Sequence, residues 1–164
     1  MRMSESHKKK IFKLIKPYKN IFIYVSKDDE IDTKNFIEEL LAKNYTVIVP
    51  KIENDDLIPM KISSFDELKP GKYNILEPSN APIVKKEDID VFIIPGTKFD
   101  ESRNRKGRGR GYFDRFLADV KGKKPIIGIC MQKQLTSKID TKPWDIPMDV
   151  VVSEEKTIDW CDLP

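Results

Sequence analysis

The chain has 164 residues, of which 39% are hydrophobic and 35% charged, and its formal net charge of +3 is too small to argue for a nucleic-acid partner. Its length predicts a single domain over residues 1–164. The chain has one histidine, His7, and two widely spaced cysteines, Cys130 and Cys161, which excludes the usual zinc sites and histidine-based catalytic triads. No apolar run reaches the roughly 20 residues of a membrane span, so we expect a cytoplasmic protein without a membrane partner.

The first half of the chain alternates apolar runs with an amphipathic stretch. Residues 21–25 form a continuous apolar run, which is typical of a strand covered on both faces. Asp32 is a candidate N-cap for a helix whose apolar side carries Phe36, Ile37, Leu40 and Leu41. We expect the next strand at residues 46–49, ended by Pro50, and a weaker strand at residues 57–62.

The second half repeats this alternation after a proline-containing loop at residues 69–84. A buried strand is predicted at residues 90–94, followed by a helix whose apolar face carries Tyr112, Phe113, Phe116, Leu117 and Val120. Further strands are expected at residues 125–130 and 150–152. The pattern predicts an α/β domain with a largely parallel sheet. Ligands bind beyond the carboxyl ends of such strands, where the loops after Val25, Ile94 and Cys130 would gather.

The most distinctive segment is the loop between the predicted strand at residues 90–94 and the helix that starts at Tyr112. It reads Arg-Lys-Gly-Arg-Gly-Arg-Gly-Tyr-Phe-Asp-Arg over residues 105–115. Glycines let a backbone approach a ligand closely or adopt a positive φ, and guanidinium groups bind phosphate or carboxylate oxygens in pairs. A helix that begins just after the glycines offers unpaired N–H groups to an anion. The loop therefore predicts a polyanion site, most simply for a nucleotide.

Five stretches of the chain, in order, give a specific resemblance to a known family. They are Glu30-Ile31-Asp32-Thr33, Leu76-Glu77-Pro78, the run from Ile94-Pro95-Gly96 through Phe99-Asp100 to the loop at residues 105–115, Gly128-Ile129 with Gln134, and residues 143–149 with the sequence Pro-Trp-Asp-Ile-Pro-Met-Asp. Together they span most of the chain. The sequence resembles the 5-formyltetrahydrofolate cyclo-ligase family, also called methenyltetrahydrofolate synthetase.

The resemblance implies a three-layer α/β fold with a mostly parallel central sheet, related to sugar-phosphate isomerase and CoA-transferase domains. It also implies a reaction in which ATP, with Mg²⁺, phosphorylates the formyl oxygen of 5-formyltetrahydrofolate. Attack by N10 then closes the ring and phosphate leaves, giving 5,10-methenyltetrahydrofolate and ADP. The expected partners are a reduced folate and a nucleotide, and the expected cofactors are ATP and Mg²⁺.

Residue by residue, the resemblance implies that ATP contacts Arg105, Lys106, Gly107, Arg108, Gly109, Arg110, Gly111, Tyr112 and Phe113. The reduced folate would contact Val25, Glu30, Arg108, Gly109, Arg110, Gly111 and Tyr112. Arg108 and Tyr112 would act in catalysis, and Gln134 is a candidate secondary contact. Asp114 and Asp145 would hold Mg²⁺, because a hard cation prefers oxygen ligands.

Three features depart from the family pattern. The family begins with a helix that carries a lysine and, four residues later, an arginine, both of which reach ATP. Only 23 residues precede Tyr24, so we expect that helix to be missing, residues 1–20 to form a variable segment and residues 156–164 a tail. Within the loop, Arg103 stands where a glycine is usual and Lys106 where a leucine is usual. We expect His7 and Lys8–Lys10 to be surface groups.

Other interpretations remain open at this point. A non-catalytic relative would bind folate or a nucleotide without turnover. A nucleic-acid-binding module would use the arginines and the Tyr112-Phe113 pair to bind phosphates and stack bases, and this is the less favoured alternative. We expect Trp144 to be a packing residue, Glu77 a turn residue and Cys130 an inert buried thiol. The expected assembly is a monomer or a weak homodimer.

Overall fold

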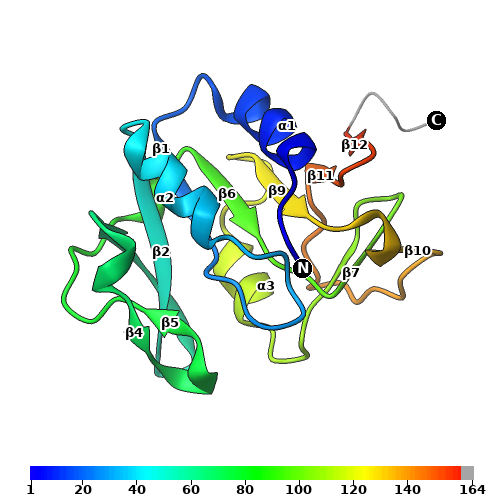
Figure 1. Cartoon of the computed structure of the whole chain (residues 1–164). Helices are drawn as coiled ribbons and strands as arrows, with labels where there is room; N and C mark the ends of the chain where they lie inside the picture. Colours follow the sequence, from blue (N-terminus) through cyan, green and yellow to red (C-terminus); the bar gives the residue numbers. More distant parts are fainter. Residues whose placement is uncertain (160–164) are drawn as a thin grey trace.

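The computed structural model describes residues 1–159, and a seven-stranded sheet forms their centre. The strand order is β12-β11-β9-β6-β1-β2-β3 (Figure 1). The five inner strands are parallel to their neighbours, whereas β3 and β12 pair antiparallel at the two edges. The strands are β1 (Asn20–Ile23), β2 (Thr46–Glu53), β3 (Asp56–Ile62), β6 (Val91–Ile94), β9 (Ile126–Ile129), β11 (Val150–Val152) and β12 (Thr157–Ile158). This confirms the predicted α/β class with a mostly parallel sheet.

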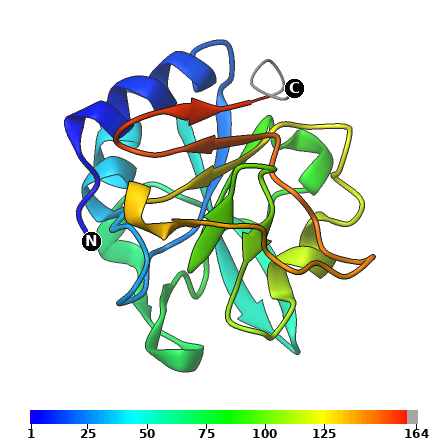
Figure 2. The same cartoon turned by 90° about the vertical axis from the view of Figure 1, so that its right-hand side faces the viewer.

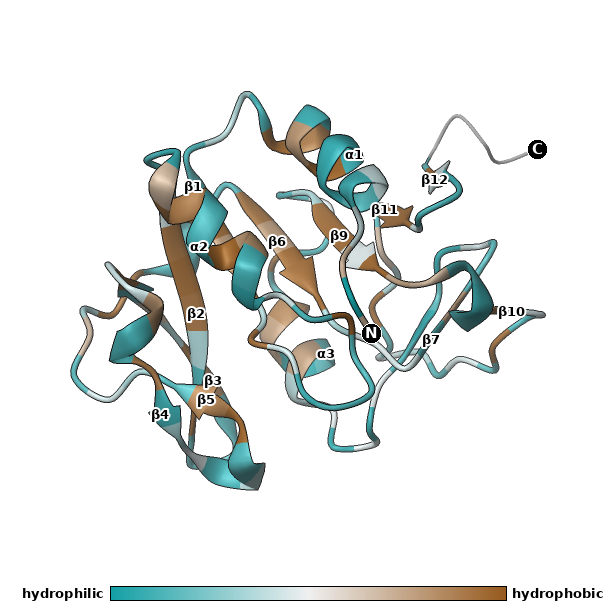
Figure 3. Cartoon of the chain, viewed as in Figure 1, coloured by the Kyte–Doolittle hydropathy of each residue, from teal (hydrophilic) through white to brown (hydrophobic). Residues whose placement is uncertain are grey.

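The middle of the sheet is predominantly apolar, and β6 is apolar at every position, because both faces of the sheet are covered (Figure 3). Val91 and Ile93 point into one hydrophobic cluster, and Phe92 and Ile94 point into the other. All four side chains are fully buried. Alternation along β1 is the same, with Phe22 packed on Phe92 at a ring-centroid distance of 5.5 Å. The continuous apolar runs of the sequence are therefore explained by two cores rather than one.

Helices complete three layers, as predicted (Figures 1 and 2). α1 (Glu5–Ile15) and α2 (Lys34–Ala42) cover one face of the sheet, and their apolar sides join the first cluster. α3 (Tyr112–Leu117) covers the other face through Phe116 and Leu117. Four short 3-10 helices lie in the connections: η1 (Phe65–Glu67), η2 (Lys72–Asn74), η3 (Lys86–Asp88) and η4 (Gln132–Gln134).

Two small sheets were not predicted. One has the order β10-β7-β8, from Leu135–Thr136, Lys98–Asp100 and Arg105–Lys106. The other pairs β4 (Lys69–Pro70) with β5 (Leu76–Glu77), inside the segment predicted to be a loop. Asp100 holds the first sheet together, because its buried carboxylate accepts hydrogen bonds from the backbone N–H groups of Ser102, Asn104 and Ile139.

The N-terminal segment contains a helix, and the expectation that His7 is a surface group was wrong. His7 is fully buried in α1. Its Nε2 donates to the backbone carbonyl of Cys130 at 2.8 Å, and its Nδ1 accepts from the backbone N–H of Ser4 at 3.1 Å. The helix is thereby fixed to the end of β9. It carries no arginine and contributes no residue to the cavity described below.

Two boundary predictions were also wrong. Pro50 does not end β2, which continues to Glu53. Beyond Ile48 the strand pairs only with β3, where Pro50 lies opposite Pro59, and a proline is tolerated where its missing N–H is not needed by a neighbouring strand. The N-cap of α2 is Thr33 rather than Asp32, although the Asp32 carboxylate accepts from the backbone N–H of Lys34 at 2.9 Å.

The predicted C-terminal tail begins with a strand, because β12 lies within it and pairs with β11. Cys161 and the end of the predicted tail lie outside the described residues. None of the helices within residues 1–159 has the length and apolar character needed to cross a membrane.

Candidate functional site

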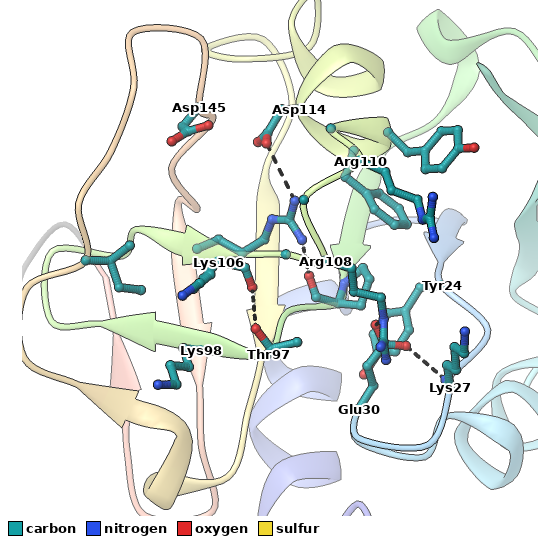
Figure 4. A pocket seen from close by; sticks show the side chains of 18 of the residues that line it. Tyr24, Lys27, Glu30, Thr97, Lys98, Lys106, Arg108, Arg110, Asp114 and Asp145 are labelled. Atoms are coloured by element: carbon teal, nitrogen blue, oxygen red, sulfur yellow. Dashed lines mark hydrogen bonds and ion pairs between the residues drawn. The ribbon is translucent and has the colours of Figure 1, made fainter. Parts of the chain in front are cut away.

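A cavity of about 1200 Å³ lies at the carboxyl ends of the central strands (Figure 4). Its walls come from the segments that follow β1, β6 and β10, together with residues of β2, β3 and the β4-β5 hairpin. The predicted gathering of loops at one edge is confirmed. All thirteen predicted site residues line this cavity: Val25, Glu30, Arg105, Lys106, Gly107, Arg108, Gly109, Arg110, Gly111, Tyr112, Phe113, Asp114 and Asp145.

The cavity is lined by more cationic than anionic side chains, eight Lys or Arg against five Asp or Glu. A concave, partly apolar surface with such an excess of positive charge suits an anionic small molecule that also carries a ring system. Both expected ligands, a nucleotide and a folate, fit that description.

Two glycines of the loop adopt conformations that other residues rarely take. Gly109 has a φ of 91° and Gly111, which precedes α3, a φ of 71°. A Cβ on Gly107 would lie 3.0 Å from the guanidinium nitrogens of Arg105. Arg103, where the family has glycine, also has a positive φ of 66°. The backbone at residue 103 thus keeps the conformation that glycine favours, although the side chain differs. Since α3 has only six residues, its dipole is a minor part of the site.

Arg108 connects two walls of the cavity. Its guanidinium pairs with Asp29, and its Nε lies 3.5 Å from Oε2 of Glu30. Glu30 is 8% exposed, and its Oε1 accepts from the backbone N–H of Lys27 at 2.9 Å. Burial raises the pKa of the Glu30 carboxyl, while the hydrogen bond from Lys27 and the charge of Arg108 oppose that rise. A buried acceptor with a raised pKa is a candidate contact for ring N–H groups.

Arg105 is held within the wall rather than extended into the cavity. Its Nη1 donates to the carbonyl of Pro95 at 2.7 Å, and its Nη2 lies 3.8 Å from Oδ2 of Asp114. The side chain is 6% exposed and stacks on Phe113 at 5.6 Å. Burial lowers the pKa of the Arg105 guanidinium, and Asp114 opposes this shift. The geometry makes Arg105 an orienting group for Asp114.

Asp114 and Asp145 face the same part of the cavity (Figure 4). Oδ1 of Asp114 accepts from the backbone N–H of Ile146 at 3.1 Å, which ties the start of α3 to the segment that carries Asp145. Oδ2 of Asp145 accepts from the backbone N–H of Lys142 at 2.8 Å. No cluster of three or more His, Cys, Asp or Glu ligands occurs in residues 1–159. Two carboxylates suit Mg²⁺, which usually keeps waters and binds substrate phosphates alongside one or two carboxylates.

Sequence reasoning missed the contribution of the β4-β5 hairpin. Tyr73 lies at its turn, and the guanidinium of Arg110 is 4.0 Å from the centroid of the Tyr73 ring. The Tyr73 and Tyr112 hydroxyls are 3.4 Å apart. Tyr73 has a φ of 60°, which is uncommon for an aromatic residue. The signal available in the sequence was only the neighbouring Pro70-Gly71 pair, which predicts a turn but not its contacts.

Two subsidiary predictions change. Gln134 does not line the cavity; its amide donates to the carbonyl of Thr97 at 3.1 Å and accepts from the backbone N–H of Met131 at 2.8 Å, so it positions the loop after β6. Trp144 is not a packing residue, because it is 66% exposed and lines the cavity beside Asp145. Glu77 lines the cavity from β5 and accepts from the backbone N–H of Ile52 at 3.3 Å.

Comparison with known proteins agrees with this description. The family model described as the 5-formyltetrahydrofolate cyclo-ligase family matches residues 1–154. A 5-formyltetrahydrofolate cyclo-ligase of Saccharomyces cerevisiae is 32% identical over 168 residues, covering 87% of this chain and 79% of that protein. Another, from Haemophilus influenzae, is 30% identical over 141 residues and covers 82% and 75%.

Solved structures show the same likeness. The 5,10-methenyltetrahydrofolate synthetase of Aquifex aeolicus superposes with a TM-score of 0.84 at 30% identity, covering 98% of this chain and 82% of that one. The 5,10-methenyltetrahydrofolate synthetase of Mycoplasma pneumoniae gives a TM-score of 0.73 at 23% identity, covering 92% and 84%, which supports the fold alone.

Proposed function

Because the chain belongs to the 5-formyltetrahydrofolate cyclo-ligase family, we propose that it converts 5-formyltetrahydrofolate to 5,10-methenyltetrahydrofolate with MgATP, releasing ADP and phosphate. The observation that carries the proposal is that the thirteen residues singled out in the sequence meet in one cavity. A cytoplasmic location and a monomeric or weakly dimeric state remain predictions.

The proposed reaction needs the formyl oxygen to become a leaving group. That oxygen attacks the γ-phosphoryl group and displaces ADP. N10 then adds to the activated carbon and gives up its proton to solvent or to the departing phosphate, and the C–O bond breaks as phosphate leaves. The protein must hold the reactants in line and neutralise phosphate charge. In this proposal the loop at residues 105–113 surrounds the phosphates, with Arg108 and Tyr112 nearest the reacting atoms.

The proposal places the two substrates by the chemistry of the walls. Glu30 and Val25 would contact the pterin, because a buried carboxylate is a strong acceptor for ring N–H groups. Asp114 and Asp145 would hold Mg²⁺, which supplies charge neutralisation for the phosphates when it is bound. Arg105 would keep the Asp114 carboxylate in position.

The nucleic-acid interpretation is not favoured by the structure. The Arg105 and Arg108 guanidiniums are already paired within the protein, and Phe113 packs under Arg105 rather than presenting a free ring. Binding to the phosphate backbone of a nucleic acid, whatever its base sequence, needs cationic side chains that are available on an open surface.

The test is to mix the purified protein with MgATP and 5-formyltetrahydrofolate and record the new ultraviolet absorbance of the conjugated methenyl product. Arg108→Ala and Asp114→Ala should abolish most of this signal. Lys133→Ala is a matched control, because Lys133 is exposed on η4 and does not line the cavity. Binding of the folate without any product would refute catalysis and favour a non-catalytic relative.

A further inference from the structure

Lys98 and Lys106 form an unusual like-charge pair on one wall of the cavity. They are register partners in the antiparallel ladder between β7 and β8, and both line the cavity. Directly opposite residues have Cβ atoms about 5 Å apart, and like charges at such positions destabilise a sheet. The pair is held firmly, since the backbone N–H and hydroxyl of Thr97 both donate to the carbonyl of Lys106, at 2.8 and 3.1 Å.

The two ammonium groups differ from the guanidiniums of Arg105, Arg108 and Arg115 in having no ion pair or hydrogen bond among the described residues. Within residues 1–159, neither Lys98 nor Lys106 makes a side-chain ion pair or hydrogen bond. By contrast, Arg105 is bound to Pro95, Arg108 to Asp29 and Glu30, and Arg115 to the carbonyls of Arg110 and Asp55. Arg110 also has no ion pair among the described residues, but its guanidinium lies over the Tyr73 ring at 4.0 Å. On the β7-β8 wall the unpaired charge therefore belongs to Lys98 and Lys106, and an anion would relieve their mutual repulsion.

Their place in the cavity indicates which anion. In Figure 4 both lysines lie to the left of Glu30, and Asp145 lies above them on the same side of the view. The end of the cavity that holds Glu30 suits the pterin, whereas the end that holds the two aspartates suits a metal-bound polyphosphate. A triphosphate concentrates about four negative charges within a few ångströms, more than two neighbouring carboxylates provide.

We propose that Lys98 and Lys106 act together as a clamp on the phosphates of the nucleotide, with Lys98 as a binding residue outside the loop at residues 105–113. The inference rests on the proposed function and deepens it. Lysine amines are compact point charges on flexible stems, so two of them on adjacent strands can follow a phosphate chain. The family pattern has leucine at the position of Lys106, so the clamp is a feature of this chain rather than of the pattern.

The experiment measures the dissociation constant of MgATP by calorimetry, alongside the Michaelis constants for MgATP and for 5-formyltetrahydrofolate. Lys98→Ala and Lys106→Ala should each weaken MgATP binding about fivefold, as expected for a partly exposed ion pair. The double variant should bind more weakly than either single variant, with a shallower dependence of affinity on salt. The Michaelis constant for 5-formyltetrahydrofolate should stay within twofold of the wild-type value.

Further variants separate charge from structure. Lys98→Arg and Lys106→Arg should keep the affinity for MgATP. Lys106→Leu should weaken it about fivefold, as Lys106→Ala does, and Lys133→Ala should leave it unchanged. Thermal unfolding of the alanine variants should be unchanged or shifted upward, because a like-charge pair has been removed. A loss of folding would leave the arginine and leucine variants to decide the question.

The outcomes distinguish this inference from the proposed function. If the wild-type chain forms methenyl product but the lysine variants bind MgATP normally, the clamp is refuted and the activity stands. If the variants instead weaken only a polyglutamylated folate, the anion is a glutamate tail and the clamp is again refuted. If the wild-type chain neither binds MgATP nor forms product, both proposals fail together.

Discussion

The guanidinium of Arg108 lies against the buried carboxylate of Glu30, with Nε 3.5 Å from Oε2. The two residues are 78 positions apart, and they lie in segments that follow β1 of the central sheet and β8 of the small sheet. Their contact joins the proposed pterin wall to the proposed phosphate wall. Changes at either residue should therefore affect both halves of the cavity.

Glu30→Gln should change how stability depends on pH. Burial raises the pKa of the Glu30 carboxyl above its ordinary value of 4.5, so the folded state binds this proton more tightly than the unfolded state. The stabilising contribution is fully present below pH 4.5, and it is lost as the pH rises through the folded-state pKa. The stability of Glu30→Gln relative to wild type should therefore increase between pH 4 and pH 7.

Urea unfolding at a series of pH values tests this expectation, and the exposed α2 residue Glu38 offers a matched control in Glu38→Gln. A relative stability of Glu30→Gln that falls with rising pH would contradict the assigned cause of the pKa shift. In the proposed function, the same variant should also bind 5-formyltetrahydrofolate more weakly.

Gly109→Ala should lower the binding free energy of MgATP by more than it lowers the free energy of unfolding. Gly109 has a φ of 91°, so a Cβ costs about 1 kcal/mol of strain even though no heavy atom lies within 4 Å of it. Gly122→Ala is a matched control, because Gly122 has a φ of 79°, open space around it and no place in the cavity. The two variants should unfold at similar urea concentrations.

Only Gly109→Ala should weaken MgATP binding in calorimetry, since the loop would relax away from its positive φ and move its N–H groups. Equal affinities in the two variants would show that the conformation of the loop at residue 109 is not needed for the nucleotide.

Much of this arrangement could be predicted from the sequence, for identifiable reasons. Residues 21–23 of β1 and all of β6 are apolar at every position, which is the pattern of a strand covered on both faces. Gly109 and Gly111 indicated a backbone conformation that other residues rarely adopt.

The missed features depend on partners far away in the sequence. β7 and β8 have only three and two residues, and their ladder is fixed by Asp100 and the segment that contains Ile139. His7 is buried because its imidazole reaches the carbonyl of Cys130, 123 positions away. No pattern in the neighbouring sequence predicts either contact. Trp144 was assigned to packing by its residue type, but the cavity wall leaves it exposed.

His7→Ala should lower the free energy of unfolding by about 2–4 kcal/mol, from a lost buried hydrogen bond and the space left by the ring. The Nε2 hydrogen bond to the Cys130 carbonyl connects α1 with the end of β9, and the Nδ1 contact caps the helix through Ser4. Urea unfolding measures the effect. Lys9→Ala, on the exposed side of the same helix, should change the stability by less than about 0.5 kcal/mol. An equal, small effect of both variants would show that α1 is not fixed by His7.

Asp114→Asn and Asp145→Asn should raise the Mg²⁺ concentration needed for half-maximal methenyl formation, because each removes one of two carboxylates that face the same part of the cavity. The Asp114 variant should have the larger effect. Oδ1 of Asp114 also accepts a hydrogen bond from the Ile146 N–H, and Oδ2 lies near Arg105. An amide at this position would therefore weaken the contact between α3 and the segment that carries Asp145. Asp66→Asn serves as the control, because Asp66 is exposed on η1 and lies outside the cavity.

Titration with Mn²⁺ in the presence of ADP, followed by electron paramagnetic resonance, reports metal binding directly. A Mn²⁺ affinity equal to that of the control in both variants would remove the two aspartates from the metal site.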